Sequence, residues 1–210
     1  MKYIFDFDDV LFDNTKQFKE HMYMHLEKAG VSRKKTEEYY KTIPKNQFWL
    51  KTILAHFSLK EDLYETILRE SKNFVNEELV NIIKKLGKNN CYIVTHGYEE
   101  WQRDKIQRAG IAPLFSEIMT TQGSKKEAVE AICAKHKDEQ VVFIDDKAKH
   151  FEDLDFQKYP NLKTILYDKV WISEKMIFIK ISAGFYFSVV LSIGGSTSTG
   201  TIVKRRWPMV

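Results

Sequence analysis

The sequence predicts an α/β fold with a parallel sheet that is covered by helices on both faces and interrupted by one long helical insertion. From residue 88 onward, short apolar runs alternate with amphipathic stretches, which is typical of parallel strands joined by crossover helices. Before that point, residues 14–87 are mostly helical in pattern. The 210 residues, of which 43% are hydrophobic, can bury the core of one domain with a large insertion or of two small domains. We therefore expect a Rossmann-like core over 1–13 and 88–168, a helical insertion over 14–87 and a C-terminal extension over 169–210.

The first half of the chain contains one expected strand, at residues 3–5, followed by several expected helices. Asn14 or Thr15 can cap the first helix, and Gly30 can end it in a left-handed conformation. Further amphipathic segments with helical spacing lie at 47–57, around 63–67 and at 79–86.

The second half alternates between the two kinds of element. We expect strands at 91–95, 116–120, 141–144 and 162–167, and helices at 99–109 and 124–136. Ligands of parallel sheets bind at the carboxyl ends of the strands. Asp6, Thr95 and Asp145 all stand at such ends, so we expect them around one crevice.

Charge and cysteine content limit the range of partners. The net charge of +4 arises in the last 36 residues, because the first 174 hold 28 basic and 29 acidic residues, and the two signs are interspersed. This distribution is unlike the concentrated basic face of a nucleic-acid-binding protein, so no nucleic acid is expected. With only Cys91 and Cys133, and without a signal peptide before the first acidic motif, we expect a cytoplasmic protein without disulfides.

The first candidate motif is Asp6-Phe7-Asp8, directly after the first strand. Two carboxylates at positions i and i+2 point to the same side of an extended chain, and the alternative is a solvated acidic turn. One carboxylate can attack a phosphate ester to give an aspartyl phosphate. The second can protonate the leaving group and later take a proton from water.

A second acidic pair, Asp145-Asp146, follows the strand at 141–144. It could simply be the acidic start of a helix. Together with Asp6 and Asp8, however, it would bring four carboxylates near a phosphate, which requires a cation. Oxygen ligands beside a phosphate favour Mg²⁺.

Two further motifs can bind the phosphate. Thr95 offers a hydroxyl, and the His96-Gly97 backbone can approach a phosphate oxygen closely, although Thr95 could simply end a strand. Lys125 and Lys126 lie in the first turn of a helix that Ser124 and Glu127 would cap reciprocally. Cations are unfavourable there unless an anion is nearby, so one of the two lysines is expected to bind one; a surface pair without a role is the alternative.

In this order, the four motifs resemble those of the haloacid dehalogenase-like superfamily of aspartate-nucleophile phosphohydrolases, over residues 1 to about 168. The resemblance implies that Asp6 is the nucleophile, that Asp8 is the acid and base, and that 14–87 is a helical cap over the site. It also implies phosphate binding by Thr95, His96 and Lys125, with Lys126 as the alternative lysine. Mg²⁺ would be held by the Asp6 side chain, the Asp8 backbone carbonyl and Asp146. Asp145 would either bind the ion directly or contact the residues that do.

The resemblance further implies a reaction. A second Asp in the first motif favours hydrolysis of a phosphate ester, because the dehalogenases and transport ATPases of the superfamily lack it. We therefore expect a Mg²⁺-dependent phosphatase for a small phosphorylated metabolite. The alternatives are a phosphotransferase or phosphomutase with the same intermediate, or a phosphate-binding module without catalysis.

Several positions depart from the family pattern or remain open. Asp9 stands where the family usually has Gly, and His150 where a further acid or Asn often follows. His21 and His25 have helical spacing but lack a third ligand, so we expect surface residues rather than a metal site. The candidate residues that line the site from the insertion are Lys45, Asn46 and Trp49.

The tail is the part least similar to the family. Its apolar segment at 176–194 approaches the length of a membrane span, with a basic flank at 204–206. Lys180 would be costly in a membrane, and the alternation of β-branched residues favours strands. A membrane contact, extra strands and an extension without regular structure all stay open.

Overall fold

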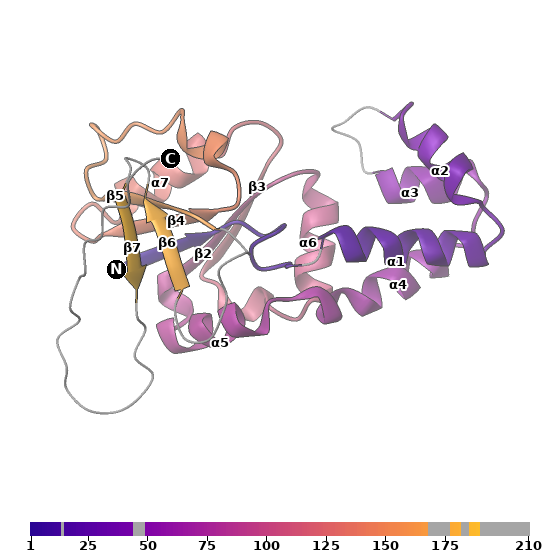
Figure 1. Ribbon diagram of the computed structural model, residues 1–210, viewed down its shortest axis with the longest axis horizontal. Helices are drawn as coiled ribbons and strands as arrows, with labels where there is room; N and C mark the ends of the chain where they lie inside the picture. Colours follow the sequence, from indigo (N-terminus) through magenta and orange to yellow (C-terminus); the bar gives the residue numbers. More distant parts are fainter. Residues whose placement is uncertain (14, 44–48, 168–176, 182–184, 190–210) are drawn as a thin grey trace, which may run out of the picture.

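A computed structural model of the chain describes residues 1–13, 15–43, 49–167, 177–181 and 185–189 (Figure 1). Its centre is a parallel sheet of five strands in the order β3-β2-β1-β4-β5, with helices on both faces, which confirms the predicted fold class. The strands are β1 (Lys2–Phe5), β2 (Cys91–His96), β3 (Glu117–Thr121), β4 (Val141–Asp145) and β5 (Leu162–Leu166). The helices are α1 (Thr15–Lys28), α2 (Arg33–Tyr40), α3 (Trp49–His56), α4 (Asp62–Arg69), α5 (Glu77–Leu86), α6 (Glu99–Arg108) and α7 (Lys126–Lys135).

Successive residues of the central strand pack into two separate cores. Phe5 lies in the same hydrophobic cluster as Ile106 of α6, whereas Ile4 lies in the cluster that contains Val129 of α7. Side chains of a strand alternate between the faces of a sheet, so α6 and α7 cover opposite faces. Both faces of the sheet are therefore buried, as the apolar strands require.

The register of the sheet brings the candidate motifs to one edge. Phe5 pairs with Ile93 of β2 and with Ile144 of β4. The residues just beyond these pairs, which include Asp6 and Asp145, consequently lie level with one another. The strand ends that were predicted to surround one crevice therefore lie side by side.

Between β1 and β2, helices α1 to α4 extend away from the sheet (Figure 1). Gly30 ends the turn after α1 with φ +93°, as predicted for a left-handed residue. Helix α2 was not predicted as a separate element. The candidate lining residues Lys45 and Asn46, and the side chain of Trp49, lie outside the described residues.

Helix α6 joins this helical insertion to the sheet. Its buried Trp101 packs against Phe18 of α1 and Tyr64 of α4. Three polar pairs run between α6 and the insertion: Tyr64 with Asp104, where the hydroxyl donates at 2.5 Å, Lys51 with Glu100, and Glu65 with Arg108. The insertion therefore rests on the same helix that covers one face of the sheet.

The tail adds two antiparallel strands beside β5. They are β6 (Ile177–Ile181) and β7 (Phe185–Val189), and Leu166 pairs with Lys180. This agrees with the open alternative of extra strands, while the Gly/Ser/Thr-rich stretch and the basic end lie outside the described residues. Among the helices that the structure describes, none has the length and apolar character needed to cross a membrane.

Two histidines and two cysteines lie away from the candidate motifs and are at least partly buried. His21 and His25 are partly buried, their rings meet edge to face with centroids 4.5 Å apart, and the ring of His21 also lies beside that of Phe74. Cys91 and Cys133 are buried free thiols.

Candidate active site

The first motif lies on a tight turn after β1. The turn is closed by backbone hydrogen bonds from Phe12 to Phe7 at 2.8 Å and from Asp9 to Phe12 at 2.9 Å. Asp9 adopts φ +63°, a left-handed conformation that Asp tolerates better than most residues. This explains how the chain accommodates Asp at the position where the family usually has Gly. The turn leaves Asp6 buried at the strand end and Asp8 partly exposed.

Lys125 lies between two buried carboxylates. Its Nζ is 2.8 Å from Asp6 Oδ1 and 2.6 Å from Asp145 Oδ2, and its side chain is only 1% exposed. Lys126 points elsewhere: it is exposed and donates to the backbone carbonyl of Asp153. Of the two lysines that the sequence left open, the structure brings Lys125 to the acids.

The start of α7 differs in detail from the predicted capping box. Ser124 Oγ accepts from the Lys126 N–H at 2.9 Å, but the N-cap position is taken by Lys125, whose side chain makes no cap bond. Helix α7 begins at Lys126, and the reciprocal bond from Glu127 is not among the hydrogen bonds of the described residues. The reason is that Lys125 precedes the helix and turns inward to the acids.

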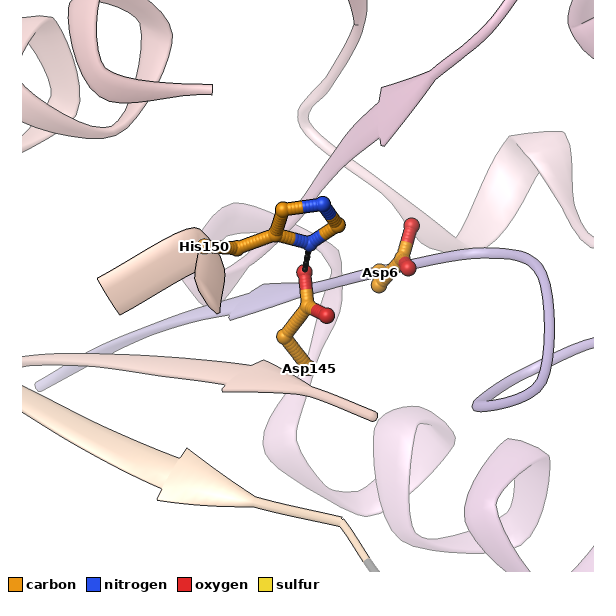
Figure 2. A group of neighbouring side chains, drawn as sticks. All are labelled: Asp6, Asp145 and His150. Carbon is orange, nitrogen blue, oxygen red and sulfur yellow. Dashed lines mark hydrogen bonds and ion pairs between the residues drawn. The ribbon is translucent and has the colours of Figure 1, made fainter. Parts of the chain in front are cut away.

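Asp145 is held by three donors. Its Oδ2 accepts from His150 Nδ1 at 2.8 Å (Figure 2). The same oxygen accepts from Lys125 at 2.6 Å, and Oδ1 accepts from the Lys147 N–H at 2.8 Å. Since a carboxylate only accepts, His150 must carry its proton on Nδ1. Burial lowers the pKa of His150, which favours this neutral ring. Asp145 is thus fixed from three sides.

Asp6 keeps one oxygen available. Its Oδ1 accepts from the Phe7 N–H at 2.7 Å and pairs with Lys125, while Oδ2 has no hydrogen bond among the described residues. Burial raises the pKa of Asp6 to about 7; Lys125 lowers it and the charge of Asp145 raises it. The carboxylate form of Asp6 would be stabilised by another cation nearby.

Asp146 is less constrained than Asp145. Its only described partner is Lys147 Nζ, at 3.3 Å. Burial raises the pKa of Asp146, with Lys147 acting in the opposite direction and Asp145 in the same direction. Burial also lowers the pKa of Lys147, but Asp146, Asp6 and Asp145 together outweigh burial and raise it. The ammonium of Lys147 therefore interacts with several acids of the site at once.

Asp8 is held by two residues of α6. Lys105 Nζ donates to Asp8 Oδ1 at 2.5 Å, and Gln102 Nε2 donates to Asp8 Oδ2 at 2.8 Å. Burial would raise the pKa of Asp8, but Lys105 and Gln102 outweigh it and leave the pKa below its usual value. Both carboxylate oxygens are thus engaged by the protein.

The end of β2 supplies an unpartnered hydroxyl. Thr95 Oγ1 is buried without a hydrogen-bond partner in the described part of the chain. The Gly97 N–H donates to the Thr121 carbonyl at 2.8 Å. The ring of His96 turns toward the Gly123 carbonyl, 2.9 Å from Nδ1. Thr95 is consequently the better-placed phosphate contact of this segment.

The donor set fits Mg²⁺. Asp6 has an open oxygen, Asp146 has one distant partner, and burial disfavours the charge of both. Ligand atoms of Asp6, Asp145 and His150 also lie within 4.8 Å of one another, but His150 and Asp145 are already bonded to each other. Mg²⁺ prefers oxygen ligands, so Asp6 and Asp146 suit it better than His150 does.

Three residues of the site, Lys105, Gln102 and Lys147, were not predicted from the sequence, and neither was the contact of His150 with Asp145. A signal for the first two exists. Trp101, Gln102, Lys105 and Ile106 form the buried stripe of α6, so a lysine and an amide stand among its core-facing residues. A charged side chain in such a stripe indicates a buried partner.

Comparison with known proteins gives one family. The sequence model of the haloacid dehalogenase-like hydrolases matches residues 3–150. No curated protein is similar enough in sequence to count as a match.

Solved structures agree in fold. A haloacid dehalogenase-like hydrolase from Burkholderia xenovorans LB400 is 17% identical over 77% of this chain and 79% of its own, with a TM-score of 0.59. The magnesium-bound hydrolase YfnB from Bacillus subtilis is 17% identical over 78% and 84%, with a TM-score of 0.47. A hydrolase of this superfamily from Ehrlichia chaffeensis is 22% identical over 83% and 90%, with a TM-score of 0.40. At these identities the likeness concerns the fold alone.

Proposed function

Because the chain belongs to the haloacid dehalogenase-like hydrolases, we propose that it is a cytoplasmic, Mg²⁺-dependent phosphatase that cleaves a phosphate monoester of a small metabolite through an aspartyl-phosphate intermediate. The observation that carries the proposal is the state of Asp6. One of its oxygens is held by Lys125 and the Phe7 N–H, and the other has no hydrogen bond among the described residues. A carboxylate fixed in this way is suited to nucleophilic attack.

In the first half of the reaction, one carboxylate oxygen of Asp6 bonds to phosphorus while the ester P–O bond breaks. The electron pair of that bond goes to the leaving oxygen, which takes a proton from the carboxylic-acid form of Asp8. In the second half, Asp8 takes a proton from water, and the water oxygen attacks phosphorus. The bond to Asp6 then breaks, which releases inorganic phosphate and restores the carboxylate.

Lys125 and Thr95 would bind the phosphate oxygens. The ammonium of Lys125 already neutralises the two acids beside it, and the hydroxyl of Thr95 is a buried donor without a partner. Both are fixed before substrate arrives, as electrostatic stabilisation of a transition state requires. His96 can add only a backbone contact, because its ring is turned to Gly123.

Mg²⁺ would be held by the Asp6 side chain, the Asp8 backbone carbonyl and Asp146, and when bound it would supply positive charge to the phosphoryl oxygens. Asp145 would support this group by fixing Lys125, since its own oxygens are already engaged. The helical insertion would act as the cap that excludes water and contacts the substrate.

The test is the chemistry of Asp6 and Asp8. The purified chain is mixed with Mg²⁺ and an aryl phosphate, whose leaving group needs little protonation, and the reaction is quenched rapidly for intact-protein mass spectrometry. We expect a phosphate adduct on Asp6 in Asp8→Asn, because attack is retained and hydrolysis lacks its base, and none in Asp6→Asn. Phosphate release by Asp6→Asn at the normal rate would refute the mechanism.

The same experiment separates the alternatives. Transfer of the phosphoryl group to an added alcohol in preference to water would indicate a phosphotransferase. An unmodified and inactive protein that still binds inorganic phosphate would indicate a binding module.

A further inference from the structure

A buried lysine outside the four motifs contacts the proposed acid and base. Lys105 comes from α6, and its side chain is 4% exposed. Its ammonium is surrounded by the rings of Phe7, Phe12 and Trp101, whose centroids lie 5.2, 5.4 and 5.4 Å away. Its one carboxylate partner in the described part of the chain is Asp8. A charge in such surroundings is costly, and the aromatic faces and Asp8 offset only part of that cost.

The second contact of Asp8 ties it to the end of β2. Gln102 Nε2 donates both to Asp8 Oδ2 and to the His96 carbonyl, each at 2.8 Å. A Cβ atom on Gly97 would lie 2.6 Å from the same nitrogen, so glycine leaves the room that Gln102 occupies. The amide of Gln102 is therefore held in one place, next to the segment that carries Thr95.

We propose that Lys105 and Gln102 are positioning residues that fix the Asp8 carboxylate in the orientation needed for proton transfer. The proposal rests on the function proposed above. Asp8 stands on a turn and is 23% exposed, so without these two donors its side chain could rotate toward solvent. With them, each oxygen has one fixed donor. Proton transfer depends on such geometry, since the acid must lie within hydrogen-bond reach of the reacting oxygen.

The alternative is that Lys105 serves only the packing of α6. The two roles differ in the step that they affect. Loss of packing would lower stability and slow both halves of the reaction. Loss of positioning would slow the steps that use Asp8 and spare the attack by Asp6 on a substrate with an activated leaving group.

The experiment measures both halves in the full chain with Mg²⁺ and an aryl phosphate. In Lys105→Met we expect the phosphoryl-enzyme to form within about threefold of the normal rate and to hydrolyse at least about tenfold more slowly, with KM nearly unchanged. Lys105→Arg should recover part of the loss, because it restores a cationic donor. Arg103→Met, on the exposed side of the same helix, should leave both steps unchanged.

A double variant gives the sharper criterion. In an Asp8→Asn background, Lys105→Met should slow hydrolysis no further, because the group that it positions is already absent. Full additivity of the two changes, or normal hydrolysis by folded Lys105→Met, would overturn the proposal. If Lys105→Met does not fold, Gln102→Leu is decisive: slowed hydrolysis with normal phosphorylation supports the proposal and two normal rates overturn it.

Failure of the proposed function looks different. In that case no phosphoryl-enzyme forms in the unmodified chain. If only the positioning proposal fails, the unmodified chain still forms the phosphoryl-enzyme.

Discussion

Lys125→Met is the substitution whose effect can best be worked out from the structure. The ammonium of Lys125 lies between Asp6 and Asp145, whose side chains are 4% and 0% exposed. Its removal leaves two buried carboxylates facing each other without a cation. Breaking a buried ion pair in this way costs about 3–5 kcal/mol.

Protonation limits the loss. The pKa of Asp6 is already raised to about 7, so without Lys125 this carboxyl would take up a proton and remove one of the two charges. We therefore expect the free energy of unfolding to fall by about 3 kcal/mol, near the lower end of that range. For a chain of this length, that corresponds to a fall in Tm of about 10 °C.

The assay is urea unfolding of the metal-free protein, with activity measured in Mg²⁺ on the same preparations. Lys126→Met is the matched control, because the side chain of Lys126 is exposed. Its Nζ lies 3.7 Å from Glu130 Oε1, so the substitution breaks a surface ion pair. It should change stability by no more than about 0.5 kcal/mol and leave turnover nearly normal. Lys125→Met should lower turnover by at least about a hundredfold. If Lys126→Met were the more damaging change, or Lys125→Met cost less than about 1 kcal/mol, the reasoning would fail.

Three further outcomes are expected. Lys147→Met should strengthen Mg²⁺ binding about threefold or more in calorimetry, because an ammonium no longer neutralises Asp146, whereas Lys163→Met, at an exposed position of β5, should not; equal affinities would contradict the electrostatic role of Lys147. Asp9→Val should lower stability in thermal unfolding by about 1–2 kcal/mol, because a β-branched residue fits φ +63° poorly, and Asp9→Gly should stay within about 1 kcal/mol of the unmodified chain. A chain ended after Tyr167 should keep cooperative unfolding and activity, since β1 to β5 and all site residues remain; loss of either would show that the tail packs on the core.

Local patterns were sufficient for most of the fold. The strand predicted at 141–144 is β4 at Val141–Asp145, a mostly buried apolar run, and the one predicted at 116–120 is β3 at Glu117–Thr121, a partly exposed strand at the edge of the sheet. Helix α2 was not predicted separately. Among its residues only Thr36 is buried, so it lacks the apolar stripe that indicates a helix, and it relies on the cap from Ser32 to Lys35.

Site residues at the ends of strands could be predicted from the sequence. Contacts between side chains from distant segments could not. Asp6 and Asp145 could be placed together because parallel strands end at one edge. The family resemblance favoured Lys125 over Lys126, but the residue pattern alone could not decide between two adjacent lysines at the predicted helix start. The pairing of Lys105 with Asp8 joins residues 97 positions apart, and no local pattern specifies such a partner.

Helix α6 limits how independently the two parts of this enzyme can change. Its outer side carries the insertion through Tyr64, Lys51 and Glu65, and its inner side holds Asp8 through Lys105. An insertion borrowed from another enzyme would therefore have to match the outer side of α6, or it would shift the helix and with it the carboxylate. Under the proposed role of the insertion as a cap, variation that changes substrate preference without loss of catalysis is easiest in the part of the insertion farthest from α6. The same helix offers a route by which closure of the insertion over a substrate could be communicated to Asp8.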